Sequence, residues 1–492
     1  VREPSQGWQF VRTKKWVIFA ISLAMVVPCL WHRRIAAGDL ASHIYNAWLA
    51  QLIEKGQAPG LYLVRQWNNV LFDWTFQHAA NVVGFAVAEK IVVSACVLIF
   101  FWGVFALLAA AGGKPPWSLV PCVAMLAYGY SFNMGFLNYY LSLGLAAFCL
   151  ALLWRGKGME RFPGLVLVPF VLLAHPVGFF WLTGTALYLI LWTKLPSWWK
   201  WAVPAAALVL LLGVRWYLAH QTRFPVDWVH DPFYLMNGAD QLTLYGQRYA
   251  ALGWAALVFG VLCVLVDVIL RGRDASLWQS LRLPAELYVV AIVAVALLPE
   301  NLRPSISGGW IGLLASRLTA ITAIFGLCLM ICLKPRKWHL VGFAACAIVF
   351  FVFLYQDTLV LNRMESNAED LVSRLPFGTR VIATIWAPPR SRVSFIGHIA
   401  DRACIGRCFS YANYEPASGQ FRVRARPGNP VVSSSDDDTE DMQAGEYEVQ
   451  DEDLPVMEIF QCDEKDLTKL CIRALASGEK NGRLGYRPHP DD

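Results

Sequence analysis

An aspartate and a histidine stand four residues apart in a polar segment that follows the first long apolar run. Segment 38–56 (GDLASHIYNAWLAQLIEKG) predicts a helix, which Asp39 can cap and Gly56 can end. Asp39 and His43 would then share one helix face, where a carboxylate can act as a general base. The alternative is that Asp39 is only a helix cap and His43 a surface residue beside it. An apolar stripe predicts that this helix lies on the membrane surface, facing lipid or the bundle; it comprises Leu40, Ile44, Ala47, Trp48 and Ile53.

Two further polar segments carry side chains suited to binding. Arg65, Trp67 and Asn68 follow the predicted helix, and such mixtures of aromatic and polar groups bind sugars by stacking and hydrogen bonds. Segment 223–231 (RFPVDWVHD) brings two carboxylates and an imidazole within five positions, in Asp227, His230 and Asp231. This segment would bind a sugar or a divalent cation, or it is a solvated loop with incidental acids.

Isolated charged or ionisable side chains stand at the ends of other apolar runs. His175 precedes Pro176 between two such runs, where it either faces a functional cavity or bonds a neighbouring backbone group in a tight turn. Glu300, Arg303 and Arg317 surround the start of a later run. An arginine there either snorkels to lipid headgroups or clamps a phosphate. We therefore take Arg303 and Arg317 as candidate phosphate ligands.

Composition and hydropathy place most of these residues in a membrane protein. The chain has 492 residues, of which 57% are hydrophobic and 16% charged, and this excludes an ordinary soluble enzyme. Apolar runs predict about eleven membrane-spanning helices. They cover approximately residues 16–31, 91–112, 118–132, 137–154, 163–175, 177–193, 201–218, 249–270, 284–299, 313–333 and 338–355.

The charge pattern orients these spans. Residues before Tyr355 carry 26 Lys and Arg against 13 Asp and Glu, whereas the remainder carries 16 against 23. Alternate loops hold nearly all the basic residues, which predicts a cytoplasmic N-terminus and an extracytoplasmic C-terminus. Arg33 and Arg34, next to the first span on the other side, oppose this orientation. The long loop 32–90 would then be extracytoplasmic.

The last part of the chain reads as a separate soluble domain. We expect a transmembrane domain over 1–355 and a small extracytoplasmic α/β domain over 356–492, with a strand at 379–384. Segment 433–453 is so acidic that we expect a mobile loop. Cys404, Cys408, Cys462 and Cys471 lie in this domain, and their even number suits one or two structural disulfides; a zinc site is the alternative.

In these features the chain resembles the GT-C superfamily of polytopic glycosyltransferases. The resemblance rests on an acid soon after the first span, here Asp39, on the long first outside loop, on about eleven spans and on the soluble C-terminal domain. It implies an enzyme of the bacterial inner membrane and cell envelope that takes a sugar from a polyprenyl-phosphate carrier on the extracytoplasmic side. It also implies that Asp39, with His43 as its neighbour, serves as catalytic base or metal ligand. Turn 130–139 lacks the second acid that many members carry in the next outside loop, which puts a metal in doubt.

The sequence thus predicts an inverting membrane glycosyltransferase that uses a polyprenyl-phosphate-linked sugar. Its acceptor would be a glycan, a lipid or a protein, and it would lie in the lipid bilayer. A divalent cation is the one possible cofactor. We expect no nucleic-acid partner. Two other functions remain open on the same residues: a transporter or flippase of a lipid-linked substrate, and an inactive accessory subunit with a related fold.

Overall fold

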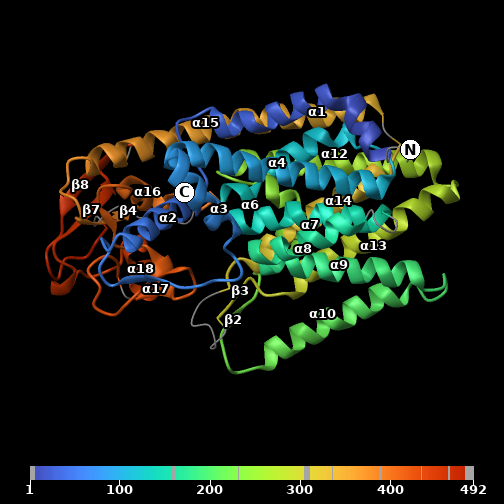
Figure 1. Cartoon of the computed structure of the whole chain (residues 1–492). Helices are drawn as coiled ribbons and strands as arrows, with labels where there is room; N and C mark the ends of the chain where they lie inside the picture. The colour runs from blue at the N-terminus through green and yellow to red at the C-terminus, as the bar shows by residue number, and fades with distance from the viewer. Residues whose placement is uncertain are drawn as a thin grey trace.

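The computed structural model describes residues 6–156, 161–230, 232–303, 311–334, 336–386, 391–433, 435–463 and 466–482. Long helices run side by side over most of the molecule, and the C-terminal strands gather at one end, on the left in Figure 1. We call this the sheet end. One predicted site residue, Asp231, lies outside the described residues.

Within the described ranges, nine helices are long and apolar enough to cross a membrane, which makes the chain a polytopic membrane protein. Each agrees with one predicted apolar run. They are α1 (Gln6–Leu30), α4 (Phe85–Gly112), α7 (Leu137–Arg155), α9 (Pro176–Lys194), α10 (Ala202–His220), α12 (Gln247–Arg271), α13 (Ala275–Leu297), α14 (Leu314–Ile331) and α15 (Lys337–Val372).

The two other predicted runs form shorter elements. Run 163–175 becomes α8 (Phe162–Ala174), which is apolar but has only 13 residues. Run 118–132 is divided into the turn η1 (Trp117–Leu119), α5 (Val120–Ala127) and α6 (Tyr130–Asn133). The break falls at Gly129, whose extended backbone ends the helical ladder. A hydropathy window cannot detect such a break, because the side chains on both sides of it are apolar.

The centre of the bundle is the contact between α4 and α7, and two glycines allow it. A Cβ at Gly103 would lie 2.2 Å from the backbone oxygen of Gly144, and one at Gly144 would lie 2.7 Å from the backbone of Phe100. Close helix contacts through small residues are typical of membrane bundles, where van der Waals packing drives association. This contact fixes the sheet-end terminus of α7, which carries Asn138 and Tyr139.

Basic side chains gather at the end of the bundle opposite the sheet. Lys114 donates to the Leu333 carbonyl at 2.8 Å, Arg155 donates to the Ala110 carbonyl at 2.6 Å, and Arg336 lies 3.6 Å from the Asp267 carboxylate. At the sheet end, Arg33 and Arg34 both form salt bridges with Glu369.

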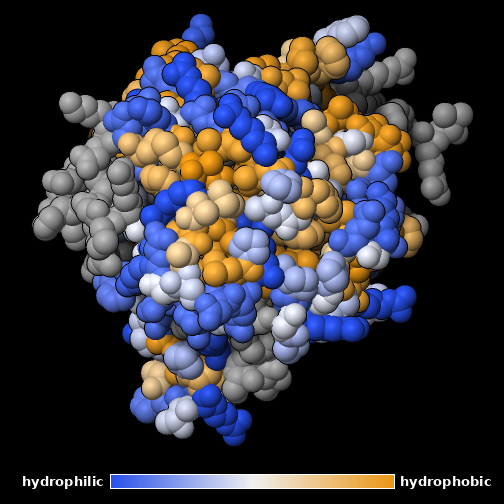
Figure 2. Space-filling model, turned by 90° about the vertical axis from the view of Figure 1, so that its left-hand side faces the viewer, coloured by the Kyte–Doolittle hydropathy of each residue, from blue (hydrophilic) through white to orange (hydrophobic). Residues whose placement is uncertain are grey.

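The C-terminal residues form a four-stranded sheet in the order β5-β4-β7-β8, with β5 (Phe409–Ser410), β4 (Arg380–Thr384), β7 (Val456–Gln461) and β8 (Leu470–Ala474). Strand β4 is parallel to both its neighbours, and β7 and β8 are antiparallel. Strand β4 confirms the strand predicted at 379–384. Viewed onto the sheet end, the surface is mainly hydrophilic, with hydrophobic residues gathered near its centre (Figure 2).

Helix α2 (Leu40–Glu54) is buried over nearly its whole circumference, between α3 (Leu71–Val83), α16 (Ile399–Cys404) and a two-stranded ribbon. Of the two surfaces that its apolar stripe was expected to face, lipid or protein, it therefore faces protein. That ribbon pairs β1 (Leu61–Leu63) with β6 (Val423–Ala425) in antiparallel register. An apolar stripe packs against protein as well as against lipid, so the sequence could not distinguish the two.

The acidic segment 433–453 is folded rather than an open loop. It contains α18 (Asp436–Ala444), whose N-terminus is capped by the Ser435 hydroxyl, and the turn η5 (Asp451–Asp453). Met442 anchors the helix with 1% exposure, and the Asp453 carboxylate accepts hydrogen bonds from Tyr411 and Tyr447, both at 2.7 Å. A few buried groups thus hold a segment whose average composition suggests disorder.

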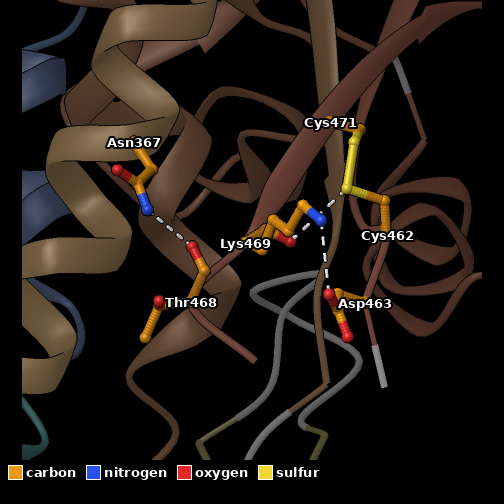
Figure 3. Close-up of a disulfide and its surroundings, with 6 residues drawn as sticks. All are labelled: Asn367, Cys462, Asp463, Thr468, Lys469 and Cys471. Carbon is orange, nitrogen blue, oxygen red and sulfur yellow. Dashed lines mark hydrogen bonds and ion pairs between the residues drawn. A yellow bond between two sulfur atoms is a disulfide. The ribbon is translucent and has the colours of Figure 1, made fainter. Parts of the chain in front are cut away.

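The four C-terminal cysteines form two disulfides, Cys404–Cys408 and Cys462–Cys471. The first closes the turn after α16, and the second joins the end of β7 to β8 (Figure 3). The other eight cysteines are free, and none of the described residues forms a cluster suited to zinc. The pairs therefore favour the disulfide interpretation over the metal site.

Candidate active site

Asp39 lies at the sheet end of the bundle, where α2 meets the turn before α7. The backbone N–H groups of Gly38 and Asp39 donate to the carbonyls of Asn133 and Met134 at 2.8 and 2.9 Å. Gly135 allows this approach, because its φ is +78° and a Cβ there would lie 2.4 Å from the Asp39 nitrogen. The Asp39 side chain makes no capping bond to α2 and is 24% exposed, so it is more than a helix cap.

The Asp39 carboxylate faces a histidine from the C-terminal domain. Its Oδ1 lies 3.5 Å from Nε2 of His398, whose Nδ1 is 2.9 Å from Oδ2 of Asp401. Asp401 also accepts a hydrogen bond from the Ser410 hydroxyl. Burial lowers the pKa of His398, but its hydrogen bonds to Asp39 and Asp401 outweigh this and raise the pKa to about 10. His398 is therefore an imidazolium at neutral pH and holds Asp39 in one orientation.

His43 lies in the same cluster, but it pairs with Asp73 and not with Asp39, the acid four residues before it. Its Nδ1 is 2.6 Å from Oδ1 of Asp73, at the start of α3, and Asn138 donates to the other oxygen of Asp73 at 2.7 Å. Burial lowers the pKa of His43, while the charge and hydrogen bond of Asp73, with Glu415 and Asp39, raise it to about 9. His43 is thus a second buried cation next to the Asp39 carboxylate.

A fourth acid completes this group of side chains. Glu415, in α17 (Tyr414–Ser418), accepts a hydrogen bond from the Ser42 hydroxyl at 3.1 Å. Burial raises its pKa to about 7, although the His43 charge opposes the shift. The ring of the neighbouring Tyr414 contacts His398 in a tilted arrangement, with 5.4 Å between the ring centres. The cluster therefore contains one carboxyl group that changes its charge near neutral pH.

Arg317, at the start of α14, adds a positive charge on the bundle side of Asp39. Its guanidinium lies 4.3 Å from the ring centre of Phe136, and its Nε is buried without a hydrogen-bond partner. Asp39 is the acid that interacts most strongly with it. His175 also interacts with Arg317, although its Nδ1 accepts from the Val177 N–H at 3.1 Å and so caps α9. The structure therefore brings Asp39, His43, His175 and Arg317 to one region.

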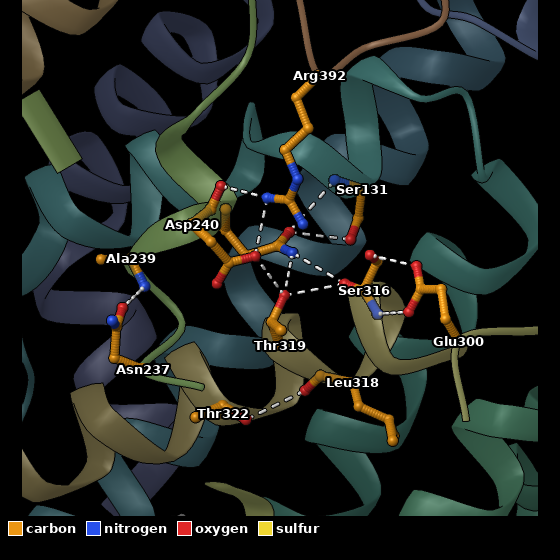
Figure 4. Close-up of polar contacts among 11 residues, drawn as sticks. Ser131, Asn237, Ala239, Asp240, Glu300, Ser316, Leu318, Thr319, Thr322 and Arg392 are labelled. Carbon is orange, nitrogen blue, oxygen red and sulfur yellow. Dashed lines mark hydrogen bonds and ion pairs between the residues drawn. The ribbon is translucent and has the colours of Figure 1, made fainter. Parts of the chain in front are cut away.

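A second arginine reaches this region from the C-terminal domain. Arg392 donates to the backbone oxygen of Asp240 at 2.6 Å and to its carboxylate at 2.8 Å, and Thr319 donates to the same carboxylate oxygen (Figure 4). The Arg392 guanidinium lies 3.9 Å from the ring centre of Tyr130. Its second terminal nitrogen is buried without a partner. Tyr130 also interacts electrostatically with both Arg392 and Arg317.

An apolar cavity adjoins the Arg392 network. Its volume is about 210 Å³, and helices α5, α12, α13 and α14 line it with side chains that include Leu126, Leu257, Val261 and Met330. Asn237 and Ala239 line this cavity and also a small pocket with Asp240. A hydrophobic space in the bundle thus shares two lining residues with the pocket that contains Asp240, the partner of Arg392.

The other predicted site residues lie elsewhere. Glu300 bonds the Ser316 hydroxyl at 2.6 Å and helps to start α14, and Arg303 lies 3.9 Å from Asp437. Asp227 and His230 are exposed or nearly so on a loop near β2 (Val226–Asp227) and β3 (Asn301–Leu302). We find no contact between this loop and Asp39 among the described residues, so the prediction that these side chains serve one site with Asp39 has no support here. Arg65, Trp67 and Asn68 are exposed beside the β1–β6 ribbon, and the Arg65 guanidinium lies 5.4 Å from the Trp67 ring.

The acids of the cluster do not form a metal site in the part of the chain that the structure describes. No three His, Cys, Asp or Glu side chains there converge at metal-binding distance. Asp39 and Asp401 face His398, and Asp73 faces His43, so imidazolium groups occupy the positions that a cation would take. We assign no step of the chemistry to a metal.

The sequence analysis missed His398, Asp401, Asp73 and Arg392. The spacing of His398 and Asp401 on one helical turn was a usable signal, but nothing local linked that pair to Asp39. A comparison of the chain with protein families, curated proteins and solved structures finds no match. The geometry of the cluster therefore carries the functional argument.

Proposed function

We propose that the protein transfers a sugar from a polyprenyl-phosphate carrier to an acceptor hydroxyl at the sheet end of the bundle. The observation that supports this most directly is the partly exposed Asp39 carboxylate, which faces His398. His398 is in turn held by Asp401, and the Arg317 charge interacts with Asp39. A fixed carboxylate beside a buried cation, at the boundary of an apolar bundle, suits a reaction between a lipid-linked donor and a water-soluble acceptor.

In the proposed reaction Asp39 accepts the proton of the acceptor hydroxyl as that oxygen attacks the anomeric carbon of the donor. The bond from the anomeric carbon to the phosphate oxygen breaks, and polyprenyl phosphate leaves with the bonding electron pair. Attack opposite to the leaving group inverts the configuration. General base catalysis of this kind contributes about 10²–10⁴-fold to the rate. His398 acts as a positioning residue, because its two nitrogens face Asp39 and Asp401.

The two arginines support a phosphate-bearing donor. Arg317 and Arg392 each have a buried nitrogen without a hydrogen-bond partner, and both interact with Tyr130. Buried donors of this kind are costly unless a ligand satisfies them, and guanidinium groups match phosphate oxygens well. The adjoining apolar cavity would receive the first part of the isoprenoid chain. Arg392 thus takes the role that the sequence suggested for Arg303.

The proposed topology has eleven crossings, with the N-terminus in the cytoplasm and the sheet end outside. The nine long helices would be joined by α8 and by the α5–α6 pair as two shorter crossings. Basic side chains at the opposite end and two disulfides at the sheet end agree with this orientation. In a bacterium this membrane would be the inner membrane, with residues 356–492 as the extracytoplasmic domain.

Transfer of radiolabelled sugar tests the proposal. Purified protein in proteoliposomes would receive a panel of polyprenyl-phosphate hexoses, pentoses and aminosugars, with cell-envelope extract as acceptor, and release of polyprenyl phosphate would be measured. We expect Asp39→Asn to abolish transfer, because the amide cannot accept the proton. Asp227→Asn is the matched control, an exposed acid near the same end, and should keep wild-type activity. Full transfer by Asp39→Asn would refute the assignment, and movement of donor across the membrane without transfer would instead show the transporter function.

A further inference from the structure

Three arginines lie at alternate positions in and beside strand β6: Arg424 is in the strand and Arg422 and Arg426 flank it. Hydrogen bonds between the backbones of Val64 and Arg422 and of Gly60 and Arg426 continue the strand pairing at both ends. Arg422, Arg424 and Arg426 alternate with Val423, which is 1% exposed, and Ala425. Alternate residues of a strand point to the same face and are about 6.5 Å apart. The buried Val423 shows that the intervening face is turned to the core. The arginines therefore form a row along the outer face of the β1–β6 ribbon.

Aromatic side chains accompany this row. Tyr62 of β1 pairs in register with Arg424, and the Arg426 guanidinium lies 5.6 Å from the Tyr62 ring. Arg65 and Trp67 continue the surface beside the other end of the row, and Trp67 is 69% exposed. Backbone contacts fix this arrangement, because the Val64 N–H donates to the Arg422 carbonyl at 2.9 Å and the Gln66 side chain donates to the Gln420 carbonyl at 3.1 Å. We call Arg65, Arg422, Arg424 and Arg426, with Tyr62 and Trp67, the arginine row.

The arginine row carries four positive charges. Among the residues that the structure describes, none of its four arginines forms a salt bridge. Arg424 makes one hydrogen bond, from its Nε to the Phe421 carbonyl at 3.3 Å. A cluster of guanidinium groups on a strand otherwise repels itself, so an anionic ligand along the row would relieve that repulsion.

One end of the row reaches the candidate active site. Burial raises the pKa of Asp73, but His43 and Asn138, with a smaller contribution from the half-buried Arg422, outweigh this and lower it. The adjacent Phe421 ring contacts Tyr414 at 5.5 Å, and Tyr414 in turn contacts His398. The arginine row therefore leads from the surface of the sheet end to the side chains around Asp39.

We propose that the acceptor is an acidic oligosaccharide, whose chain lies along the arginine row while its terminal hydroxyl reaches Asp39. This inference rests on the proposed glycosyl transfer and names its acceptor class. Guanidinium groups at regular spacing match carboxylates that recur along a glycan, and the Tyr62 and Trp67 rings offer faces for sugar stacking. A neutral glycan would use the aromatic faces but would not balance the four positive charges.

Binding of a defined acidic oligosaccharide tests the inference without requiring transfer. Full-length protein in phosphatidylcholine nanodiscs would be titrated with fluorescent hexagalacturonate and, in parallel, with its neutral methyl ester. We expect the Kd of the acid to be at least about tenfold lower than that of the ester. The affinity for the acid should decrease as the salt concentration is raised from 50 to 200 mM, because the contacts are between exposed charges.

Paired variants show where the acid binds. The double variant Arg424→Gln and Arg426→Gln should weaken hexagalacturonate binding about tenfold or more. The double variant Arg374→Gln and Arg407→Gln removes the same charge from exposed positions of the same domain and should bind like wild type. Melting temperatures would verify that both variants are folded.

Three results would overturn the inference. The first is equal binding of the acid and its ester, and the second is an equal effect of the two double variants. The third is that the Arg424→Gln and Arg426→Gln double variant loses binding to phosphatidylglycerol vesicles but keeps binding to hexagalacturonate. The last result would assign the row to the membrane surface. Binding is measured without any donor, so failure of the transfer reaction and failure of this binding site are separate outcomes.

Discussion

The side chain of Arg402 joins the C-terminal domain to the bundle, and its removal gives the sharpest test of how the two are held together. Arg402 is 5% exposed, and its guanidinium lies 3.0 Å from the Glu89 carboxylate of α4 and 3.2 Å from the Glu365 carboxylate of α15. It also donates to the Ile35 carbonyl at 3.2 Å. Arg402→Met would keep most of the side-chain volume while leaving two carboxylates buried without their cation.

The expected cost follows from this burial. Both acids are almost inaccessible, at 7% and 2% side-chain exposure, so water cannot replace the lost partner. Breaking a buried pair by removing one member typically costs about 3–5 kcal/mol. At roughly 2 °C for each kcal/mol in a large domain, the apparent melting temperature should fall by about 6–10 °C. The melting temperature in detergent, followed by fluorescence, measures this shift.

A rescue variant separates this explanation from simple misfolding. Arg402→Met combined with Glu89→Gln and Glu365→Gln removes the charges of both acids, and a glutamine at position 89 can still accept the hydrogen bond from the Ile35 N–H at 2.7 Å. Replacing a complete buried ion cluster by neutral groups is often nearly neutral, so most of the lost stability should return. Arg407→Met, on the exposed surface, is the control. A single variant as stable as wild type, or a triple variant no better than the single one, would refute the reasoning.

Three further predictions concern the candidate site and the sheet. The pKa of His398 is raised from about 6.5 to about 10 in the folded state, so its stabilising effect is complete below pH 6.5 and is lost as the pH rises through 10; His398→Gln should flatten the fall in melting temperature between pH 7 and 10. Replacing Cys462 and Cys471 with Ser should cost about 2–3 kcal/mol, from the short loop that they close, and leave sugar transfer intact in the proteoliposome assay. Gly135→Ala should reduce transfer at least about tenfold with an unchanged circular dichroism spectrum, because its Cβ would displace Asp39. Wild-type pH dependence in the first variant, lost transfer in the second or normal transfer in the third would contradict these expectations.

The membrane bundle was largely predictable from the sequence, because bilayer thickness imposes a length on every apolar helix. The nine long helices each follow a predicted run. The short elements were harder to predict, since the helix break at Gly129 depends on the backbone and not on hydropathy. The position of α2 was also hidden, because the residues that would face lipid on a surface helix instead pack against α3 and α16.

The candidate site was predictable only in the parts that have local signals. Asp39 and His43 stand out by their spacing after the first span, and Arg317 by its place at the end of an apolar run. Their partners come from distant segments, since His398 approaches Asp39 only when the C-terminal domain packs on the bundle. Asp73 likewise reaches His43 through the packing of α3 on α2. No sequence period encodes contacts of this kind, because loop lengths and tertiary packing decide them.

The same packing that assembles the site also joins the C-terminal part of the chain to the bundle. His398 is the N-cap residue of α16, and Asp401 and Arg402 follow within the helix, so one short helix and its cap supply both the partner of Asp39 and the cation of the buried cluster. Helix α15 runs without interruption from the bundle to the sheet end and holds Glu365 against that cation (Figure 1). We therefore expect a loss of the Arg402 cluster to displace His398 from Asp39. Under the proposed function, the stability of this contact and the reactivity of the Asp39 carboxylate would be coupled through a single turn of helix.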